Sequence, residues 1–110
     1  MAIEMMQGDS RAVPFTLEMS GVELDPDKLA EVEITVGYKM RKLYSAGEVF
    51  WDNLRRRWYI FPTQEDTQKM NPGAYEVQAR FKYPNGDWSP VKGLTLGRIV
   101  ITAAQSKDVI

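Results

Sequence analysis

The chain lacks cysteine and histidine altogether, and it has no excess of basic residues, with 14 Lys and Arg against 15 Asp and Glu. Without thiols or imidazoles it can hold no disulfide and no Cys or His metal site, and it has neither a thiol nucleophile nor an imidazole base. Because it has no net positive charge, it lacks the electrostatic attraction to phosphates that supplies most of the affinity of nucleic-acid binders. We therefore expect no cofactor, no small-molecule substrate and no nucleic-acid partner.

Long apolar runs are also missing, since no stretch approaches the roughly 20 residues of a membrane-spanning helix. The first nine residues contain neither a basic start nor the apolar core of a signal peptide. We expect a soluble protein made in the cytosol, with no membrane contact. A length of 110 residues fits one compact domain spanning residues 1–110.

The apolar residues that are present recur mostly with period two, which is typical of half-buried β-strands. Between residues 31 and 41 every even-numbered residue is apolar or aromatic. The odd-numbered residues are polar or charged, apart from Gly37. A second run, residues 75–83, alternates aromatic and aliphatic residues with charged and amide ones. Each run predicts one long antiparallel strand.

Shorter segments follow the same rule. Residues 13–20 alternate, and residues 48–52 and 58–61 read as two strands joined by a hairpin loop over 52–56. Between residues 94 and 101 the apolar phase slips at Gly97, which indicates either a β-bulge or a strand buried on both faces.

The turn residues agree with this plan. The pair Asn85-Gly86 suits a type I′ hairpin turn, so Trp88 should begin a return strand. Residues 21–27 read as a polar connection, and residues 63–69 as a short helix that Thr63 caps together with Asp66. In total the sequence predicts an all-β fold of seven or eight strands with one short helix, either an antiparallel β-sandwich or a small barrel.

Carboxylates are the acid and base groups that remain, and two pairs are close in sequence: Asp25 with Asp27, and Glu65 with Asp66. Neither pair has a nucleophile or a glycine-rich loop beside it, and a polar loop is a poor place to perturb a pKa. Residues 23–27 also lack the glycine and the distal glutamate of a calcium loop. We expect no catalytic residue and no metal site, so the protein is not expected to be an enzyme.

Aromatic residues are the strongest candidates for a binding surface. In the run from Trp58 to Phe61 both faces of a strand are apolar, because adjacent residues point to opposite sides. The candidate contact residues for a protein or a glycan are Trp58, Tyr59, Phe61 and Trp88; the alternative is that a helix or loop of the same chain covers them. The basic run over residues 55–57 reads as a solvated turn rather than an anion-binding site.

Tyr75 follows a proline-glycine turn at the start of a long strand. This placement resembles the tyrosine corner of immunoglobulin-like sandwiches, in which the hydroxyl donates to a backbone carbonyl upstream. It would stabilise the fold and form no binding site.

Five segments taken together resemble small proteins of phages and prophages of Gram-positive bacteria, in particular the immunoglobulin-like N-terminal domain of their upper-baseplate proteins. They are residues 6–10 (MQGDS), 47–50 (GEVF), 61–67 (FPTQEDT), 72–81 (PGAYEVQARF) and 104–110 (AQSKDVI). The resemblance spans most of the chain. It implies an immunoglobulin-like sandwich without enzymatic activity that assembles with itself or with other phage structural proteins.

Two functions follow from these observations. The first is a phage structural or assembly protein of the tail or baseplate type, present in the host cytoplasm during assembly and then in the virion. It would form oligomers through protein contacts, using residues 1–10 and 103–110 as extended arms and the free edges of its sheets. The alternative is a carbohydrate-binding sandwich in which exposed aromatic rings stack on sugars.

Overall fold

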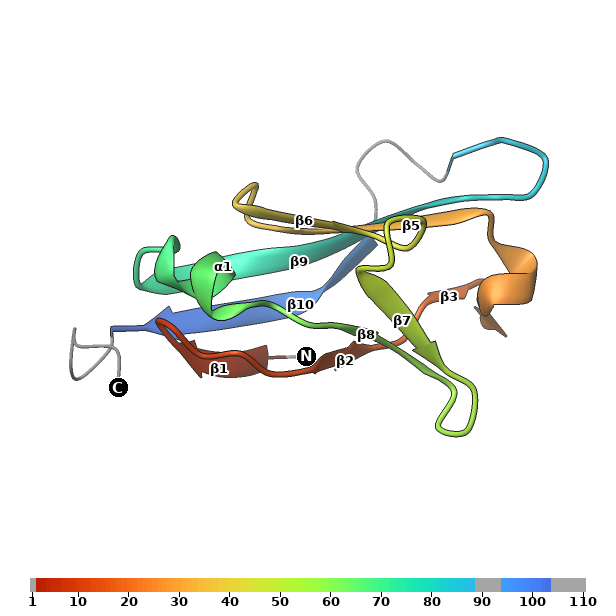
Figure 1. Ribbon diagram of the computed structural model, residues 1–110. Helices are drawn as coiled ribbons and strands as arrows, with labels where there is room; N and C mark the ends of the chain where they lie inside the picture. Colours follow the sequence, from red (N-terminus) through yellow and green to blue (C-terminus); the bar gives the residue numbers. More distant parts are fainter. Residues whose placement is uncertain (1, 89–93, 104–110) are drawn as a thin grey trace.

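The computed structural model describes residues 2–88 and 94–103 of the chain. Two sheets pack face to face, and one short helix lies at one end of them (Figure 1). The larger sheet has five strands in the order β1-β10-β9-β5-β6. Their bounds are β1 (Ala2–Met6), β5 (Glu31–Val36), β6 (Met40–Leu43), β9 (Gly73–Lys82) and β10 (Leu94–Thr102).

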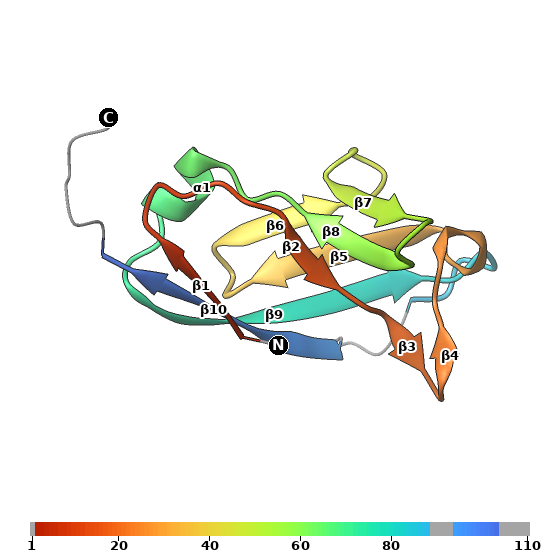
Figure 2. The same cartoon turned by 90° about the horizontal axis from the view of Figure 1, so that it is seen from below.

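The smaller sheet has three strands in the order β2-β8-β7, and a separate two-stranded hairpin, β3-β4, extends from its side (Figure 2). The described residues also form a 3₁₀ turn (η1) before β5 and the helix α1 between β8 and β9. The bounds are β2 (Val13–Phe15), β3 (Glu18–Met19), β4 (Val22–Glu23), η1 (Pro26–Lys28), β7 (Val49–Asp52), β8 (Arg57–Ile60) and α1 (Gln64–Gln68).

This strand order is that of an immunoglobulin-like sandwich, which the resemblance implies. Strands β2, β8 and β7 take the places of B, E and D, while β5, β9 and β10 take those of C, F and G. Strand β6 extends the second sheet in the C′ position, and β1 lies parallel to β10 at its other end. The remaining pairs are antiparallel.

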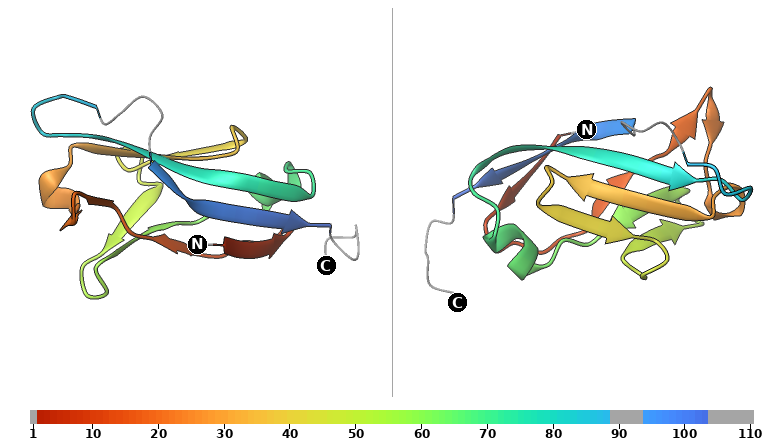
Figure 3. Two further views of the ribbon diagram at one scale, coloured as in Figure 1. Left: turned by 180° about the vertical axis from the view of Figure 1, so that it is seen from behind. Right: turned by 90° about the horizontal axis from the view of Figure 1, so that it is seen from above.

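The two sheets form two layers (Figure 3), and the core lies between them. Alternation places every second residue of β5 and β9 in this layer, because successive strand side chains point to opposite faces. The largest fully buried side chain belongs to Trp58 of β8. It belongs to a core cluster that includes apolar residues of both sheets, among them Phe15, Val32, Ile34, Val77 and Phe81.

The single strand predicted over residues 31–41 is wrong in one respect, because it is a hairpin. Gly37 and Tyr38 both have positive φ, 54° and 60°, and they form the turn between β5 and β6. Val36 and Met40 are paired across this hairpin, so both still face the core. The alternation of apolar and polar residues therefore continues through the turn, so it does not show that the chain reverses there.

The described residues hold ten strands, more than the seven or eight expected. The hairpin at Gly37 adds one, and residues 21–27, expected to be a connection, contain β4 and the first two residues of η1. The N-terminal arm is a further correction, since residues 2–6 pair with β10 as β1 and bury Met5 in the core. Of the expected C-terminal arm, residues 104–110 lie outside the described part of the chain.

Three local predictions are confirmed. Strand β10 has a β-bulge against β9 between Thr95 and Gly97, which accounts for the phase slip. The Tyr75 hydroxyl donates to the Asn71 carbonyl at 2.6 Å, which makes the tyrosine corner. Helix α1 begins with a capping box formed by Thr63 and Asp66.

Asp66 also joins α1 to the large sheet, because its carboxylate accepts a hydrogen bond from Lys42 Nζ of β6 at 2.8 Å. Burial acts to raise the pKa of Asp66, but the hydrogen bonds from Lys42 and Thr63 and the charge of Lys42 together hold it below its ordinary value. Since the folded-state pKa is the lower one, this stabilisation is complete above the unfolded-state pKa. It is lost as the pH falls through the folded-state pKa.

Asp66→Asn is expected to lower the free energy of unfolding by about 1–3 kcal/mol at neutral pH, because Lys42 loses a charged acceptor. The variant should also show a shallower loss of stability in acid than the parent, and urea unfolding at several pH values measures both effects. Glu65→Gln is the control, since the neighbouring Glu65–Lys69 pair is largely exposed and should contribute little. Equal stability of the Asp66→Asn variant and the parent at pH 7 would contradict the role given to this contact.

Candidate functional site

The two sheets differ in the residues that they present to solvent. The outer face of the five-stranded sheet is polar and carries charges, including Arg41 and Arg80, which both form ion pairs with the largely buried Glu33. The outer face of the three-stranded sheet instead carries aromatic side chains. A solvated, charged face needs no partner, whereas a cluster of exposed large apolar residues marks a binding surface.

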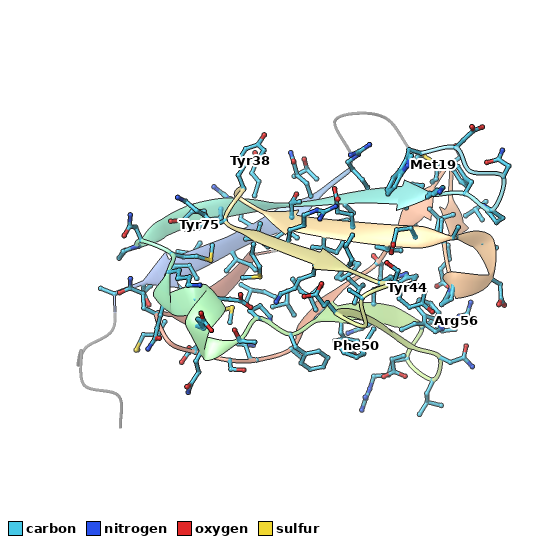
Figure 4. All side chains as sticks on the ribbon, turned by 45° about the horizontal axis from the view of Figure 1, so that its top comes forward. Met19, Tyr38, Tyr44, Phe50, Arg56 and Tyr75 are labelled. Carbon is cyan, nitrogen blue, oxygen red and sulfur yellow. The ribbon has the colours of Figure 1, made fainter. Side chains whose placement is uncertain are left out.

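We call this cluster the aromatic patch, and it consists of Pro14, Phe50, Tyr59 and Phe61. Phe50 and Phe61 are 45% and 46% exposed, and their rings meet edge to face with centroids 5.1 Å apart. The rings of Tyr59 and Phe61 are nearly parallel, with centroids 6.5 Å apart and 23° between their planes. Phe50 lies on the lower side of the molecule in Figure 4, away from the five-stranded sheet.

Strand register assembles the patch. Tyr59 on the central strand β8 is opposite Pro14 on one side and Phe50 on the other, so these three form one row across the sheet. Phe61 follows two residues after Tyr59 and faces the same side. Their immediate neighbours, Trp58 and Ile60, are fully buried on the inner face. Both faces of this segment are apolar because one forms the core and the other forms the patch.

The prediction that Trp58 contacts a partner is therefore wrong. Its side chain is 0% exposed, and its indole N–H donates to the Leu24 carbonyl at 2.9 Å. Three aromatic rings enclose it, those of Phe15, Tyr44 and Trp51. A tryptophan is the largest apolar side chain, and here its one polar atom finds a buried acceptor, so the core position satisfies it fully.

Trp88 is exposed, as expected, but it is not near the other candidates. It pairs with Lys82 of β9 and stacks on the guanidinium of Arg80, whose Cζ lies 5.0 Å from the ring centroid. It therefore belongs to the five-stranded sheet. Of the return strand expected from Trp88 onward, residues 89–93 lie outside the described part of the chain. Among the predicted residues, the structure brings together only Tyr59 and Phe61.

Phe50 and Pro14 belong to the patch and are missing from the residues selected by sequence. The predicted pairing of residues 48–52 with 58–61 could have identified Phe50, because a hairpin of that register sets Phe50 opposite Tyr59. Pro14 could not be found in this way, because the pairing of β2 with β8 joins segments far apart in the sequence.

The basic run is tied to acidic neighbours. Arg55 pairs with Asp52 at 3.3 Å, and Arg56 reaches Glu23 at 2.6 Å and Asp25 at 3.1 Å. The hydrogen bond to Glu23 is the main cause that raises the pKa of Arg56. These contacts join the β7-β8 hairpin to the segment that follows β3, and they support the interpretation of this run as a structural turn.

Among residues 2–88 and 94–103, no group of three or more Asp or Glu side chains is arranged to hold a metal ion. Within the same residues, no helix is long and apolar enough to cross a membrane. Comparisons of the chain with protein-family models, with curated proteins and with solved structures found no match. The aromatic patch is the surface from which a function can be argued.

Proposed function

We propose that the protein is a non-enzymatic structural or assembly module that acts through protein–protein contacts at the aromatic patch. The observation that carries this proposal is the exposure of Phe50 and Phe61 beside Tyr59 on the small sheet, while the large sheet is charged. Aromatic side chains supply much of the binding energy at protein interfaces, where they are enriched and charged residues are depleted at the centre. Rigid strands hold the patch in place before a partner arrives.

Within this class we propose a phage protein of the tail or baseplate type, made in the host cytoplasm and assembled into the virion. Its support is the resemblance described above, together with the immunoglobulin-like strand order that the resemblance implies. Copies of itself and other phage structural proteins would be its partners. In this reading the two sheets serve as a rigid carrier for the contact surface.

The test is the solution mass of the protein, measured by light scattering over a wide range of concentration. The parent is expected to form a defined oligomer, alone or with a structural partner. The double variant Tyr59→Ser, Phe61→Ser should associate on the order of tenfold or more weakly, because it loses two aromatic anchors. Thermal unfolding serves as the control, since both side chains point away from the core. Unchanged association of the double variant would exclude the patch as the contact surface.

A second candidate, carbohydrate binding, is favoured by one observation, the nearly parallel arrangement of the Tyr59 and Phe61 rings. Neighbouring rings of this kind can stack on successive sugars. Saturable binding in a glycan screen, lost in Phe61→Ala and retained in Trp88→Ala, would favour this candidate over assembly. Trp58→Ala is unsuitable for this test, because it removes the centre of the core.

A further inference from the structure

Strand β1 lies at an edge of the larger sheet, and among the described residues it pairs only with β10. Of its side chains, Met5 is fully buried and Ile3 packs against the core in part, while Glu4 is exposed. The pairs β10-β9, β9-β5 and β5-β6 make no use of β1, so they can persist without it. An element with one strand neighbour and few buried apolar side chains is of the kind that opens locally.

The turn that follows β1 runs beside α1 (Figure 2), and hydrogen bonds tie the two together. The Gly8 N–H donates to Thr67 Oγ1 at 3.0 Å, and the Thr67 hydroxyl donates to the Asp9 carbonyl at 2.8 Å. Gln7 Nε2 donates to the Met70 carbonyl at 3.0 Å. The bonded residues are 58 to 63 positions apart in the sequence, so the tertiary fold, and not the turn itself, supplies these contacts.

Thr67 is the centre of this junction, and it is completely buried. Its hydroxyl has one proton, and the Asp9 carbonyl is the nearest acceptor, because the carbonyls of Thr63 and Gln64 lie 3.5 and 3.2 Å away. The same oxygen accepts from Gly8. The capping box that begins α1 fixes the helix that carries Thr67. Since buried polar groups left without partners are costly, these two bonds hold the turn against α1.

We propose that residues 2–9 form a strap that opens as one unit while the rest of the sandwich stays folded, and that Thr67 is the latch that keeps it closed. Opening separates β1 from β10, moves Met5 out of the core and breaks the contacts of residues 7–9 with α1. It leaves β10 as the edge of the larger sheet, with the backbone groups that β1 had paired now free. This device goes beyond the proposed function, because it lies on the larger sheet and does not involve the aromatic patch.

Methionine oxidation measures this opening, because hydrogen peroxide converts a thioether to a sulfoxide only where it reaches the sulfur. Met6 is 38% exposed, whereas Met5 and Met40 are buried, with 1% and 5% exposed. Met5 belongs to the strap, while Met40 begins β6 in the part that stays folded. After brief treatment of the parent protein, mass spectrometry is expected to show Met6 oxidised fastest, Met5 more slowly and Met40 most slowly.

Thr67→Val is expected to raise the oxidation rate of Met5 by about tenfold or more, because valine has nearly the shape of threonine but can neither donate nor accept. Thr67→Ser keeps the hydroxyl and should oxidise Met5 at close to the parent rate. Gly47→Ala is the control for a general loss of stability. It strains the loop between β6 and β7, which stays folded when the strap opens, so the Met5 rate should not change.

Hydrogen exchange supplies an independent readout. The Gln7 N–H donates to the Thr102 carbonyl of β10 at 2.9 Å, so it exchanges when the strap opens. It should exchange faster than the amides of β5, which is paired on both sides, and faster again in Thr67→Val. Equal oxidation rates of Met5 and Met40 in the parent would overturn the strap, as would an equal rise of the Met5 rate in Gly47→Ala and Thr67→Val.

Discussion

Trp58→Ala is expected to lower the free energy of unfolding by about 3–5 kcal/mol, the usual cost of removing a large aromatic side chain from a core. The indole lies in the core cluster that residues of both sheets form, so its loss leaves a cavity there. It also leaves the Leu24 carbonyl without its 2.9 Å donor. Since domains of this size are stable by only about 5–15 kcal/mol, the variant should unfold at a much lower urea concentration.

Trp58→Phe separates the two contributions. It retains an aromatic ring but loses the N–H, so a smaller loss of about 1–3 kcal/mol is expected, mainly from the carbonyl left unsatisfied. Urea unfolding monitored by circular dichroism measures both variants on one scale. A Trp58→Ala protein that is as stable as its parent would show that this side chain does not anchor the two sheets.

Gly37→Ala is expected to cost about 2–5 kcal/mol, from two sources. The residue has φ of 54°, a conformation that alanine adopts only with strain. A Cβ placed there would also lie 2.4 Å from Cδ1 of Tyr75, so the ring would have to move. Figure 4 shows Tyr75 at the same end of the sandwich as the neighbouring turn residue Tyr38. The substitution should therefore disturb the tyrosine corner as well as the turn.

Gly47→Ala is the matched control for this prediction. Gly47 also has positive φ, at 76°, but among the described residues no atom beyond its two chain neighbours lies within 4 Å of the position of an added Cβ. It should show the conformational cost of about 1–2 kcal/mol alone. If the two alanine variants unfold at the same urea concentration, the contact between Gly37 and Tyr75 contributes nothing to stability.

Much of the fold could be predicted from local patterns. The cap of α1 at Thr63 and the Tyr75 hydroxyl bond involve residues only three or four apart, and the bulge near Gly97 changes the phase of one strand. The turn at Gly37 was hidden because Val36 and Met40 keep the same phase on both sides of it. Periodicity reports which face a residue occupies, and it does not report where a chain reverses.

Only part of the aromatic patch could be predicted from the sequence. Alternation alone shows that both faces of the segment from Trp58 to Phe61 are apolar, but it does not show which face is the core and which is the patch. Trp58 and Trp88 looked alike in sequence, since each is a tryptophan in or next to a strand. Their surroundings differ: Trp58 lies between the sheets, and Trp88 lies beside Arg80 on the outside of the larger one.

The sequence by itself determined the all-β class, most strand positions and the absence of thiol and imidazole chemistry, because all of these depend on composition or on neighbours within a few residues. Only the tertiary structure decided which tryptophan is core and that Pro14 and Phe50 flank Tyr59. Those facts depend on pairing between strands distant in sequence, and an alternating pattern is compatible with many such pairings.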